Sequence, residues 1–267
     1  MDEERKRLRL SFDADPETYD LARPGYPEQL YDDIVFWCRL GNGSKLLEIG
    51  CGTGKATIAF AERGYSVDAV EAGEQMSRFT AGITAGHRVK VVNVAFEDWE
   101  APSSFYDLAF AATSFHWTDQ RVSLMKVHRA IRGEGHFAAF WHSHIVTDRT
   151  SDAFGALQKV YEERAPPIAS VTFRKQVEKS SPEFHSMLSE SGLFEDIHHR
   201  KYHFTKSYDA DAYIRLLSTY SDHITLEGGM KKDLFSEIGK VIDGMPGGTI
   251  IKEYETVLYT AKKIEGV

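Results

Sequence analysis

An apolar segment that runs into three closely spaced glycines is the feature that most restricts the fold of this 267-residue chain. The segment reads Leu46-Leu47-Glu48-Ile49-Gly50-Cys51-Gly52-Thr53-Gly54-Lys55. Glycine lets a backbone turn sharply and lets a ligand approach without a Cβ in the way. The free amides at the start of a following helix favour an anionic group. The segment therefore predicts a strand, a ligand-binding loop and a helix in direct succession.

The chain around this loop alternates between strand and helix patterns. Apolar runs predict strands at 45–49, 66–70, 88–94, 106–111 and 135–141. Helical periodicity predicts helices at 27–38, 55–63, 76–85 and 119–131. This order predicts an α/β fold with a doubly wound parallel sheet and helices on both faces. Ligands of such folds bind beyond the carboxyl ends of the strands, at the switch point of strand order, which the first strand should form.

The second half of the chain departs from this alternation. Residues 143–192 are mostly polar and helical, with a break at Pro166-Pro167, and residues 194–204 and 249–259 have strand patterns. The two late strands should complete a mostly parallel, seven-stranded sheet whose last strand is antiparallel. We therefore expect a core formed by residues 1–142 and 193–267. The expected helical cap is an insertion over 143–192, helped by residues 209–228, and residues 11–38 should cover the cofactor.

Charge argues against a nucleic-acid partner. The formal net charge is −8, whereas a nucleic-acid binder needs a cationic face that neutralises phosphates. The one dense basic run consists of Arg5, Lys6, Arg7 and Arg9, and we interpret it as a solvated N-terminal tail. We expect a small-molecule partner and a monomer or weak dimer.

Targeting signals and cysteines bear on the compartment. No apolar run approaches the roughly 20 residues that a membrane span requires, so no membrane association is expected. The charged first ten residues do not form a secretory signal. The two cysteines, Cys38 and Cys51, form neither a disulfide framework nor a zinc pattern. A cytoplasmic protein is expected, with Cys38 in the core and Cys51 serving the backbone of the loop.

Two acidic residues and a lysine discriminate between possible cofactors. Glu71 ends the second strand, 21 residues after Gly50, where a carboxylate accepts both ribose hydroxyls of an adenosine ligand. Lys55 occupies the position of the third glycine of a dinucleotide fingerprint. Glu48, two residues before the first glycine, suits an amine and repels a pyrophosphate. The pattern favours S-adenosylmethionine over NAD.

Four motifs along the chain resemble those of the class I S-adenosylmethionine-dependent methyltransferases, which have a Rossmann-like fold. The motifs are Glu48 to Gly54, Val70 to Met76, Tyr106 to Trp117, and Arg23-Pro24-Gly25-Tyr26-Pro27. The last motif is similar to the N-terminal signature of a bacterial small-molecule subgroup near the trans-aconitate methyltransferases. The resemblance covers residues 19 to 141 and implies a methyltransferase core.

The resemblance implies a role for each matching position. Gly50, Gly52 and Gly54 line the methionine part of the cofactor, and Glu48 anchors its amine. Glu71 holds the ribose. The adenine and sulfonium neighbours implied are Met76, Phe96, Glu97, Ala112 and Thr113. Relatives often have Asp where this chain has Ala95, so Glu97 is expected to take over its contact with the adenine amino group. Met76 and Phe96 also fit plain core positions.

Three residues before the first helix of the sheet are expected to reach the cofactor. They are Tyr19, Arg23 and Tyr26. A guanidinium fork matches the cofactor carboxylate, although Arg23 also fits an exposed surface ion pair.

Candidate acceptor residues follow the fourth and fifth strands. Methyl transfer from a sulfonium needs alignment and exclusion of water, and a base only where the acceptor must lose a proton. His116 is the candidate base, because an ordinary imidazole pKa suits proton abstraction; the alternative is a structural histidine. Trp117 and His142 are expected to line the acceptor pocket, with core packing as the alternative for Trp117.

The cap loop supplies two more candidates, Tyr220 and His223, whose alternative is an ordinary helix end. His198, His199 and His203 cluster in a late strand, but no carboxylate or cysteine stands at a metal-binding spacing. We expect metal-independent chemistry. Two other functions stay open: an NAD-dependent oxidoreductase, and a catalytically silent protein that binds S-adenosylmethionine, because fold does not fix function.

Overall fold

The computed structural model describes residues 3–169 and 181–266. One seven-stranded sheet has the order β3-β2-β1-β4-β5-β7-β6. Its strands are β1 (Lys45–Ile49), β2 (Ser66–Glu71), β3 (Val89–Asn93), β4 (Tyr106–Ala112), β5 (Ile131–Ile145), β6 (Phe194–Asp209) and β7 (Thr249–Lys263). The first five strands run parallel, and β7 is antiparallel to both β5 and β6. The prediction of a doubly wound, mostly parallel sheet with an antiparallel last strand is confirmed.

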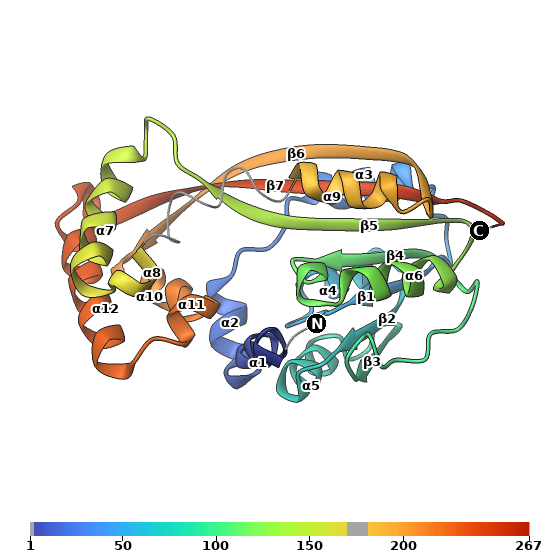
Figure 1. The fold of residues 1–267 in the computed structure, drawn as a ribbon, viewed down its shortest axis with the longest axis horizontal. Helices are drawn as coiled ribbons and strands as arrows, with labels where there is room; N and C mark the ends of the chain where they lie inside the picture. Colours follow the sequence, from blue (N-terminus) through green and yellow to red (C-terminus); the bar gives the residue numbers. More distant parts are fainter. Residues whose placement is uncertain (1–2, 170–180, 267) are drawn as a thin grey trace.

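Helices surround this sheet and extend beyond it (Figure 1). The α-helices are α1 (Glu3–Ser11), α2 (Pro16–Ala22), α3 (Glu28–Trp37), α4 (Lys55–Glu62), α5 (Glu74–Ile83), α6 (Gln120–Ala130), α7 (Ser151–Arg164), α8 (Pro166–Ala169), α9 (Ser181–Glu190), α10 (Ala210–Ser218), α11 (Ser221–Ile224) and α12 (Gly228–Asp243). Short 3₁₀ turns are η1 (Phe12–Ala14), η2 (Phe115–Trp117) and η3 (Pro246–Gly248). No helix in the described part of the chain is both long and apolar enough to cross a membrane.

Local sequence explains where several helices begin. The Asp15 carboxylate accepts the Thr18 amide at the start of α2, and Asp119 accepts the Val122 amide at the start of α6. Asp209 caps α10 through the Ala212 amide in the same way. Each cap satisfies one of the amides that a helix start leaves unpaired.

The switch point lies where the sheet prediction put it. β1 pairs with β2 on one side and with β4 on the other. Because consecutive crossovers leave β1 in opposite directions, the loops after β1 and β4 diverge and open a crevice at the carboxyl edge. The glycine loop follows β1 at this edge.

Two core clusters hold helices on opposite faces of the sheet. On one face, Leu124 of α6 and Phe184 of α9 pack against Phe137 of β5. On the other face, Ile34 of α3 and Phe60 of α4 pack in a second cluster. Each fully buried side chain of this size stabilises the fold by roughly 1.5–3 kcal/mol, so the helices around the crevice are firmly anchored.

The last three strands are longer than the sequence patterns predict. β5 pairs with β7 from His136 to Ile145, and β6 pairs with β7 as far as Asp209. Polar residues in these extensions hide them from a search for apolar runs, while the antiparallel ladder continues through them. The extended strands lead to a helical lobe formed by α7, α8, α10, α11 and α12 (Figure 1).

The residues predicted to form one cap, 143–192, lie in two separate parts of the structure. Phe154 and Leu157 of α7 pack in the core of the lobe, together with Leu216 of α10 and Leu234 of α12. By contrast, α9 packs on the sheet through Phe184 and belongs to the first core cluster. Residues 170–180 of the predicted cap lie outside the described residues.

The N-terminal basic run forms part of the fold, and the expectation of a solvated tail is wrong. It lies in α1, which sits beside α2 near the carboxyl edge of the sheet (Figure 1). Arg9 is paired with Glu97, and the Arg5 guanidinium donates to the His116 carbonyl. The run is docked because a carboxylate and a backbone carbonyl far along the chain accept from it, and composition alone does not disclose such partners.

Candidate cofactor and acceptor site

The three glycines of the loop have different physical reasons to be glycine. All three have positive φ angles: 67° at Gly50, 55° at Gly52 and 80° at Gly54. A Cβ on Gly50 would lie 2.8 Å from the Ser114 Cβ, and one on Gly54 would lie 2.8 Å from the Thr80 Cγ2. A Cβ on Gly52 meets nothing within 4 Å. Gly52 therefore borders open space, whereas Gly50 and Gly54 also allow close packing.

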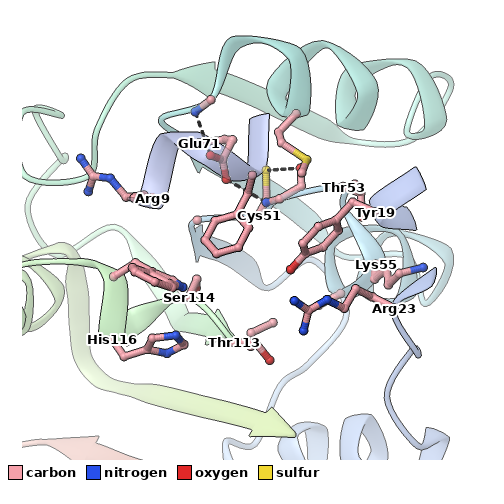
Figure 2. Close-up of a pocket in the computed structure, with 18 of the residues that line it drawn as sticks. Arg9, Tyr19, Arg23, Cys51, Thr53, Lys55, Glu71, Thr113, Ser114 and His116 are labelled. Atoms are coloured by element: carbon pink, nitrogen blue, oxygen red, sulfur yellow. Dashed lines mark hydrogen bonds between the residues drawn. The ribbon is translucent and has the colours of Figure 1, made fainter. Parts of the chain in front are cut away.

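That open space is a cavity of about 490 Å³ at the carboxyl edge of the sheet. Figure 2 shows around it residues of the N-terminal helices, of the loop after β1, of the end of β2 and of the segment after β4. The predicted site residues that line it are Tyr19, Arg23, Tyr26, Glu48, Gly50, Gly52, Glu71, Met76, Phe96, Ala112, Thr113, His116, Trp117, His142 and Tyr220. Three predicted site residues, Gly54, Glu97 and His223, do not line the cavity.

Glu71 is held at the cavity edge by two backbone amides. Its Oε1 accepts the Gly73 amide and its Oε2 accepts the Gly52 amide, both at 2.8 Å (Figure 2). Burial raises the pKa of Glu71, and these two hydrogen bonds offset part of the rise. Each carboxylate oxygen keeps a second lone pair. The side chain is thus a fixed acceptor at the end of β2.

Glu48 lies on β1, next to β2, and is a fully buried residue of the cavity lining. Its Oε2 accepts the Thr57 hydroxyl, while Oε1 is buried with no hydrogen-bond partner among the described residues. Burial raises the pKa of Glu48 to about 8, and the negative charge of Glu71 acts in the same direction. A buried carboxyl with an open acceptor is costly unless a donor meets it. The cavity wall is therefore complementary to a cationic donor.

The N-terminal segment closes the side of the cavity near Met76 and Phe96. Asp13 accepts the Met76 amide at 2.8 Å, at the start of α5. A Cβ on Gly73 would lie 2.4 Å from the Asp13 Oδ1, so only glycine allows this docking. The contribution of Asp13 and of the adjoining Phe12 was not predicted, because a lone acid in a polar segment carries no recognisable pattern.

Glu97 does not face the cavity, so the structure gives no support to its predicted contact with adenine. The Arg9 guanidinium donates to both carboxylate oxygens at 3.0 and 3.2 Å, and the Asp119 amide donates to Oε1 at 2.9 Å. Burial acts to raise the pKa of Glu97, but these donors together lower it. Arg9 lines the cavity in its place.

Gly54 has a structural reason to lie outside the cavity lining. It begins α4, and its missing side chain leaves room for Thr80 and Ile83 of α5. The glycine is required for helix packing next to the loop.

A hydrogen-bonded group joins β4 to the segment before α3. The Tyr26 hydroxyl is 2.6 Å from the Thr113 Oγ1, and the Tyr26 ring stacks on His142 with centroids 4.5 Å apart. His142 Nδ1 is 2.8 Å from the Thr256 Oγ1. Thr113 has a φ of 55°, which is strained for a β-branched residue. Such strain often marks a functional position.

His116 lies in η2, directly after β4, and borders the cavity. His116 is exposed to solvent, although protein atoms lie around much of its imidazole. This enclosure lowers the pKa of His116 to about 4, and the positive charges of Arg5 and Arg23 act in the same direction. The ring is therefore neutral at pH 7, rather than half-protonated near pH 6.5. No hydrogen-bond partner of the ring is found among the described residues.

The lobe forms the far wall of the cavity. Arg23 donates to the Thr219 hydroxyl and carbonyl at 2.8 and 2.7 Å, and its guanidinium lies 4.4 Å from the Tyr220 ring centroid. Arg23 therefore does not form the exposed surface ion pair that was the alternative interpretation. Lys252, which is buried, donates to the Tyr220 hydroxyl at 3.0 Å. The lobe is thereby tied to the N-terminal segment.

His223 is fully buried inside the lobe and does not reach the cavity, contrary to the expectation that it binds substrate. Its Nδ1 is 2.6 Å from the Asp222 Oδ1, and its Nε2 is 2.7 Å from the Tyr161 hydroxyl. Asp222 lines the cavity instead. Asp222 and His223 are adjacent in the sequence, and spacing did not show which of them faces the cavity. The orientation of the short helix α11 brings only Asp222 to it.

Metal ligands are not gathered at this site. Over residues 3–169 and 181–266, no group of three or more His, Cys, Asp or Glu residues is arranged to hold a metal ion. The expectation of metal-independent chemistry stays a prediction.

Comparisons with known proteins agree with this geometry. Residues 46–135 match the family model described as a methyltransferase domain. An uncharacterized methyltransferase of Mycobacterium tuberculosis is 28% identical over 140 residues, 52% of this chain and 55% of that protein. A probable S-adenosylmethionine-dependent methyltransferase of Saccharomyces cerevisiae is 30% identical over 129 residues, 46% of this chain and 43% of the relative. The chain thus spans about half the length of these curated relatives.

A solved structure shows the same fold at low identity. It is the Haemonchus contortus phosphoethanolamine N-methyltransferase 2, in complex with phosphomonomethylethanolamine and S-adenosylhomocysteine. The TM-score is 0.56 at 12% identity, over 95% of this chain and 58% of that one. The strand order is that of the Rossmann-like methyltransferase fold, and residues 46–135, which include the glycine loop and both acidic residues, are similar to a methyltransferase domain.

Proposed function

We propose that this protein transfers a methyl group from S-adenosylmethionine to a small-molecule acceptor. The observation that carries the proposal is the buried Glu48 carboxyl, whose Oε1 has no partner among the described residues and lines the cavity beside the glycine loop. An α-ammonium group would satisfy it and favour its ionised form, and S-adenosylmethionine carries one, whereas the pyrophosphate of NAD has no donor for this oxygen.

The other cofactor contacts follow from the cavity wall. The Glu71 carboxylate holds the ribose hydroxyls with its free lone pairs, and the adenine lies against Met76 and Phe96. Gly50 and Gly52 let the backbone approach the methionine part. Thr113, with the backbone at Ala112, faces the sulfonium. Tyr19, Arg23 and Tyr26 cover the cofactor from the N-terminal side.

A small acceptor is favoured by charge and by closure. The net charge of −8 opposes nucleic acid, and the N-terminal segment covers the cavity through the contacts of Arg9 and Asp13. The H. contortus neighbour is described with a small phosphorylated amine. The motif at 23–27 supports a place near the trans-aconitate methyltransferases. A cytoplasmic monomer or weak dimer that needs no metal belongs to the same proposal.

The transfer itself is an in-line displacement. A lone pair of the acceptor attacks the methyl carbon, the carbon–sulfur bond breaks, and the sulfur takes the electron pair, which yields S-adenosylhomocysteine. The protein aligns the two partners and excludes water. Where the acceptor is a hydroxyl, the neutral His116 ring accepts its proton. Trp117, His142 and Tyr220 line the cofactor cavity where the reacting group of the acceptor meets the methyl group.

Turnover tests this proposal. The protein is incubated with S-adenosylmethionine and with carboxylic acids, phenols and amines in turn, and S-adenosylhomocysteine is measured by mass spectrometry. We expect product with one acceptor class, loss of product in Glu71→Gln, and no loss in Glu74→Gln, an exposed residue of α5 paired with Arg78. A protein that binds S-adenosylhomocysteine without turnover is the silent binder. Thermal stabilisation by NADH alone would point to an oxidoreductase.

A further inference from the structure

A second cavity of about 650 Å³ adjoins the cofactor cavity. The two cavities share five lining residues, which we call the throat: Thr113, Ser114, His116, His142 and Ser143. A volume of this size is typical of a small-molecule site. The throat includes the residues at the carboxyl end of β4, where the proposed sulfonium lies, so an acceptor in the second cavity is within reach of the methyl group.

The walls of the second cavity are largely aromatic. They include Phe115, Phe140, Trp141, Phe184 and Met187. Phe184 of α9 makes edge contacts with the Trp141 ring at 5.2 Å and with the Phe115 ring at 6.0 Å. Offset and edge-to-face arrangements of this kind favour a further flat ring. Charged side chains of both signs, Arg5 and Glu183, also line this cavity, so it presents no excess of one charge.

Open hydrogen-bonding groups gather at the throat rather than at the lobe. His142 Nε2 is buried with no partner, and the His116 ring has none, among residues 3–169 and 181–266. Burial lowers the pKa of each imidazole to about 4, and the charge of Arg23 acts in the same direction, while the backbone of Gly25 and Pro24 acts against it at His142. Both rings are therefore neutral at pH 7, and each has one donor and one acceptor nitrogen.

The polar groups of the lobe wall are already paired. The Tyr220 hydroxyl accepts from Lys252, the Tyr254 hydroxyl lies 2.7 Å from that of Tyr208, and Asp222 holds His223. A polar acceptor molecule placed against the lobe would have to displace these hydrogen bonds. A molecule whose neutral hydroxyl lies in the throat displaces none of them and avoids that free-energy cost.

We propose that the second cavity binds the methyl acceptor, and that this acceptor is a planar aromatic molecule whose hydroxyl group points into the throat. The inference rests on the proposed methyl transfer and names its substrate class. A carboxylate of the same shape fits less well, because the two guanidiniums nearest the throat already donate elsewhere: Arg5 to the His116 carbonyl and Arg23 to Thr219. The aromatic walls hold the ring plane and thereby aim the hydroxyl oxygen at the methyl carbon.

The reaction at this position balances without another reactant. The hydroxyl oxygen forms the new bond to the methyl carbon as the carbon–sulfur bond breaks, and the hydroxyl proton passes to the imidazole of His116. The products are an aryl methyl ether and S-adenosylhomocysteine, and the proton leaves to water. His142 acts as a positioning residue whose Nε2–H donates a hydrogen bond to the hydroxyl oxygen, while its Nδ1 accepts from the Thr256 hydroxyl.

The test compares two flat probes of the same size. The affinities of 2-naphthol and 2-naphthoate are measured by calorimetry, with and without saturating S-adenosylhomocysteine, and methyl transfer to each is followed. The variants are Met187→Trp, which fills the second cavity, Met187→Ala, which enlarges it, and Ser189→Trp as control. Ser189 is exposed on the same helix and lines neither cavity.

We expect 2-naphthol to bind at least about tenfold more tightly than 2-naphthoate, a difference of about 1.4 kcal/mol. Met187→Trp should weaken 2-naphthol by about tenfold or more, because overpacking costs roughly 1–3 kcal/mol. Met187→Ala and Ser189→Trp should retain binding, and every variant should bind S-adenosylhomocysteine as the parent does.

Three outcomes would overturn the inference: tighter binding of 2-naphthoate, unchanged 2-naphthol binding in Met187→Trp, or no binding of 2-naphthol to the parent. Failure of the parent protein to bind S-adenosylhomocysteine would instead overturn the proposed function. Should Met187→Trp fail to fold, the comparison of the two probes on the parent still decides the substrate class.

Discussion

Replacing Glu48 by glutamine should change how the stability of the ligand-free protein depends on pH. Burial raises the pKa of Glu48 to about 8 in the folded chain, from an ordinary value of 4.5. Between these two values the folded state keeps a proton that the unfolded state has released. The free energy of unfolding therefore falls as pH rises through this window. Glutamine has the shape of the protonated side chain and does not titrate.

The size of this effect follows from the interval between the two pKa values. Each pH unit within it is worth about 1.36 kcal/mol, so the parent should lose up to roughly 4 kcal/mol more than Glu48→Gln between pH 5 and pH 8. This figure is an upper limit, because the cavity admits water to the carboxyl. The Thr57 hydroxyl bond lowers the pKa and the Glu71 charge raises it, and both groups are the same in the variant.

Urea unfolding of the ligand-free protein at pH 5 and at pH 8 measures the difference. Glu62→Gln, an exposed change at the end of α4, serves as the control and should follow the parent. Parallel pH dependence of the parent and Glu48→Gln, within about 1 kcal/mol, would refute the assignment of Glu48 as a buried proton-holding group.

Three further outcomes are expected. Gly52→Val should abolish S-adenosylhomocysteine binding by calorimetry in a folded chain, because valine tolerates the φ of 55° poorly and fills cofactor space; retained binding would mean that the glycine serves only the turn. With a phenolic acceptor, His116→Ala should lower kcat by roughly 10²–10⁴-fold. The parent pH profile should lack an ionisation near pH 6.5 and fall only towards pH 4, because enclosure and the charges of Arg5 and Arg23 keep His116 neutral above its pKa of about 4; a break near 6.5 would contradict this. Arg9→Gln should weaken S-adenosylhomocysteine binding by about tenfold or more, since a charged hydrogen bond worth roughly 1.5–3 kcal/mol holds α1; unchanged affinity would separate α1 from the cofactor site.

Local patterns were sufficient to predict most of the sheet. The strands β1 to β4 were predicted within two residues at either end, because fully buried parallel strands read as short apolar runs. The helix starts at Asp119 and Asp209 follow from side chains within three residues. The extensions of β5, β6 and β7 were missed, because their polar residues are kept in the sheet by pairing with a distant strand.

The site was predictable where a residue's role depends on its place in a strand or loop. Glu71 ends β2 and Gly52 lies in the first loop, and both line the cavity. Glu97 was misplaced because its partner, Arg9, lies 88 residues earlier in the chain. His223 was misplaced because the orientation of α11 depends on the packing of the lobe. Long-range contacts of this kind leave no periodic signal.

The protonation state of His116 was also beyond the sequence. An ordinary imidazole pKa made it a plausible base at neutral pH, but enclosure by protein and two nearby arginines lower that pKa. Those arginines come from the N-terminal segment, 93 and 111 residues before His116 in the chain. The chemistry of the site therefore depends on how this segment docks.

Calorimetric titration of S-adenosylhomocysteine in the presence of a metal chelator tests the central claim most directly. The account predicts one site per chain in the parent, no competition by NADH, and a loss of roughly 1.5–3 kcal/mol in Glu71→Ala, because the ribose hydroxyls lose a charged acceptor. Glu74→Ala should bind as the parent does. Unchanged affinity in a folded Glu71→Ala variant, or displacement of the ligand by NADH, would contradict the account.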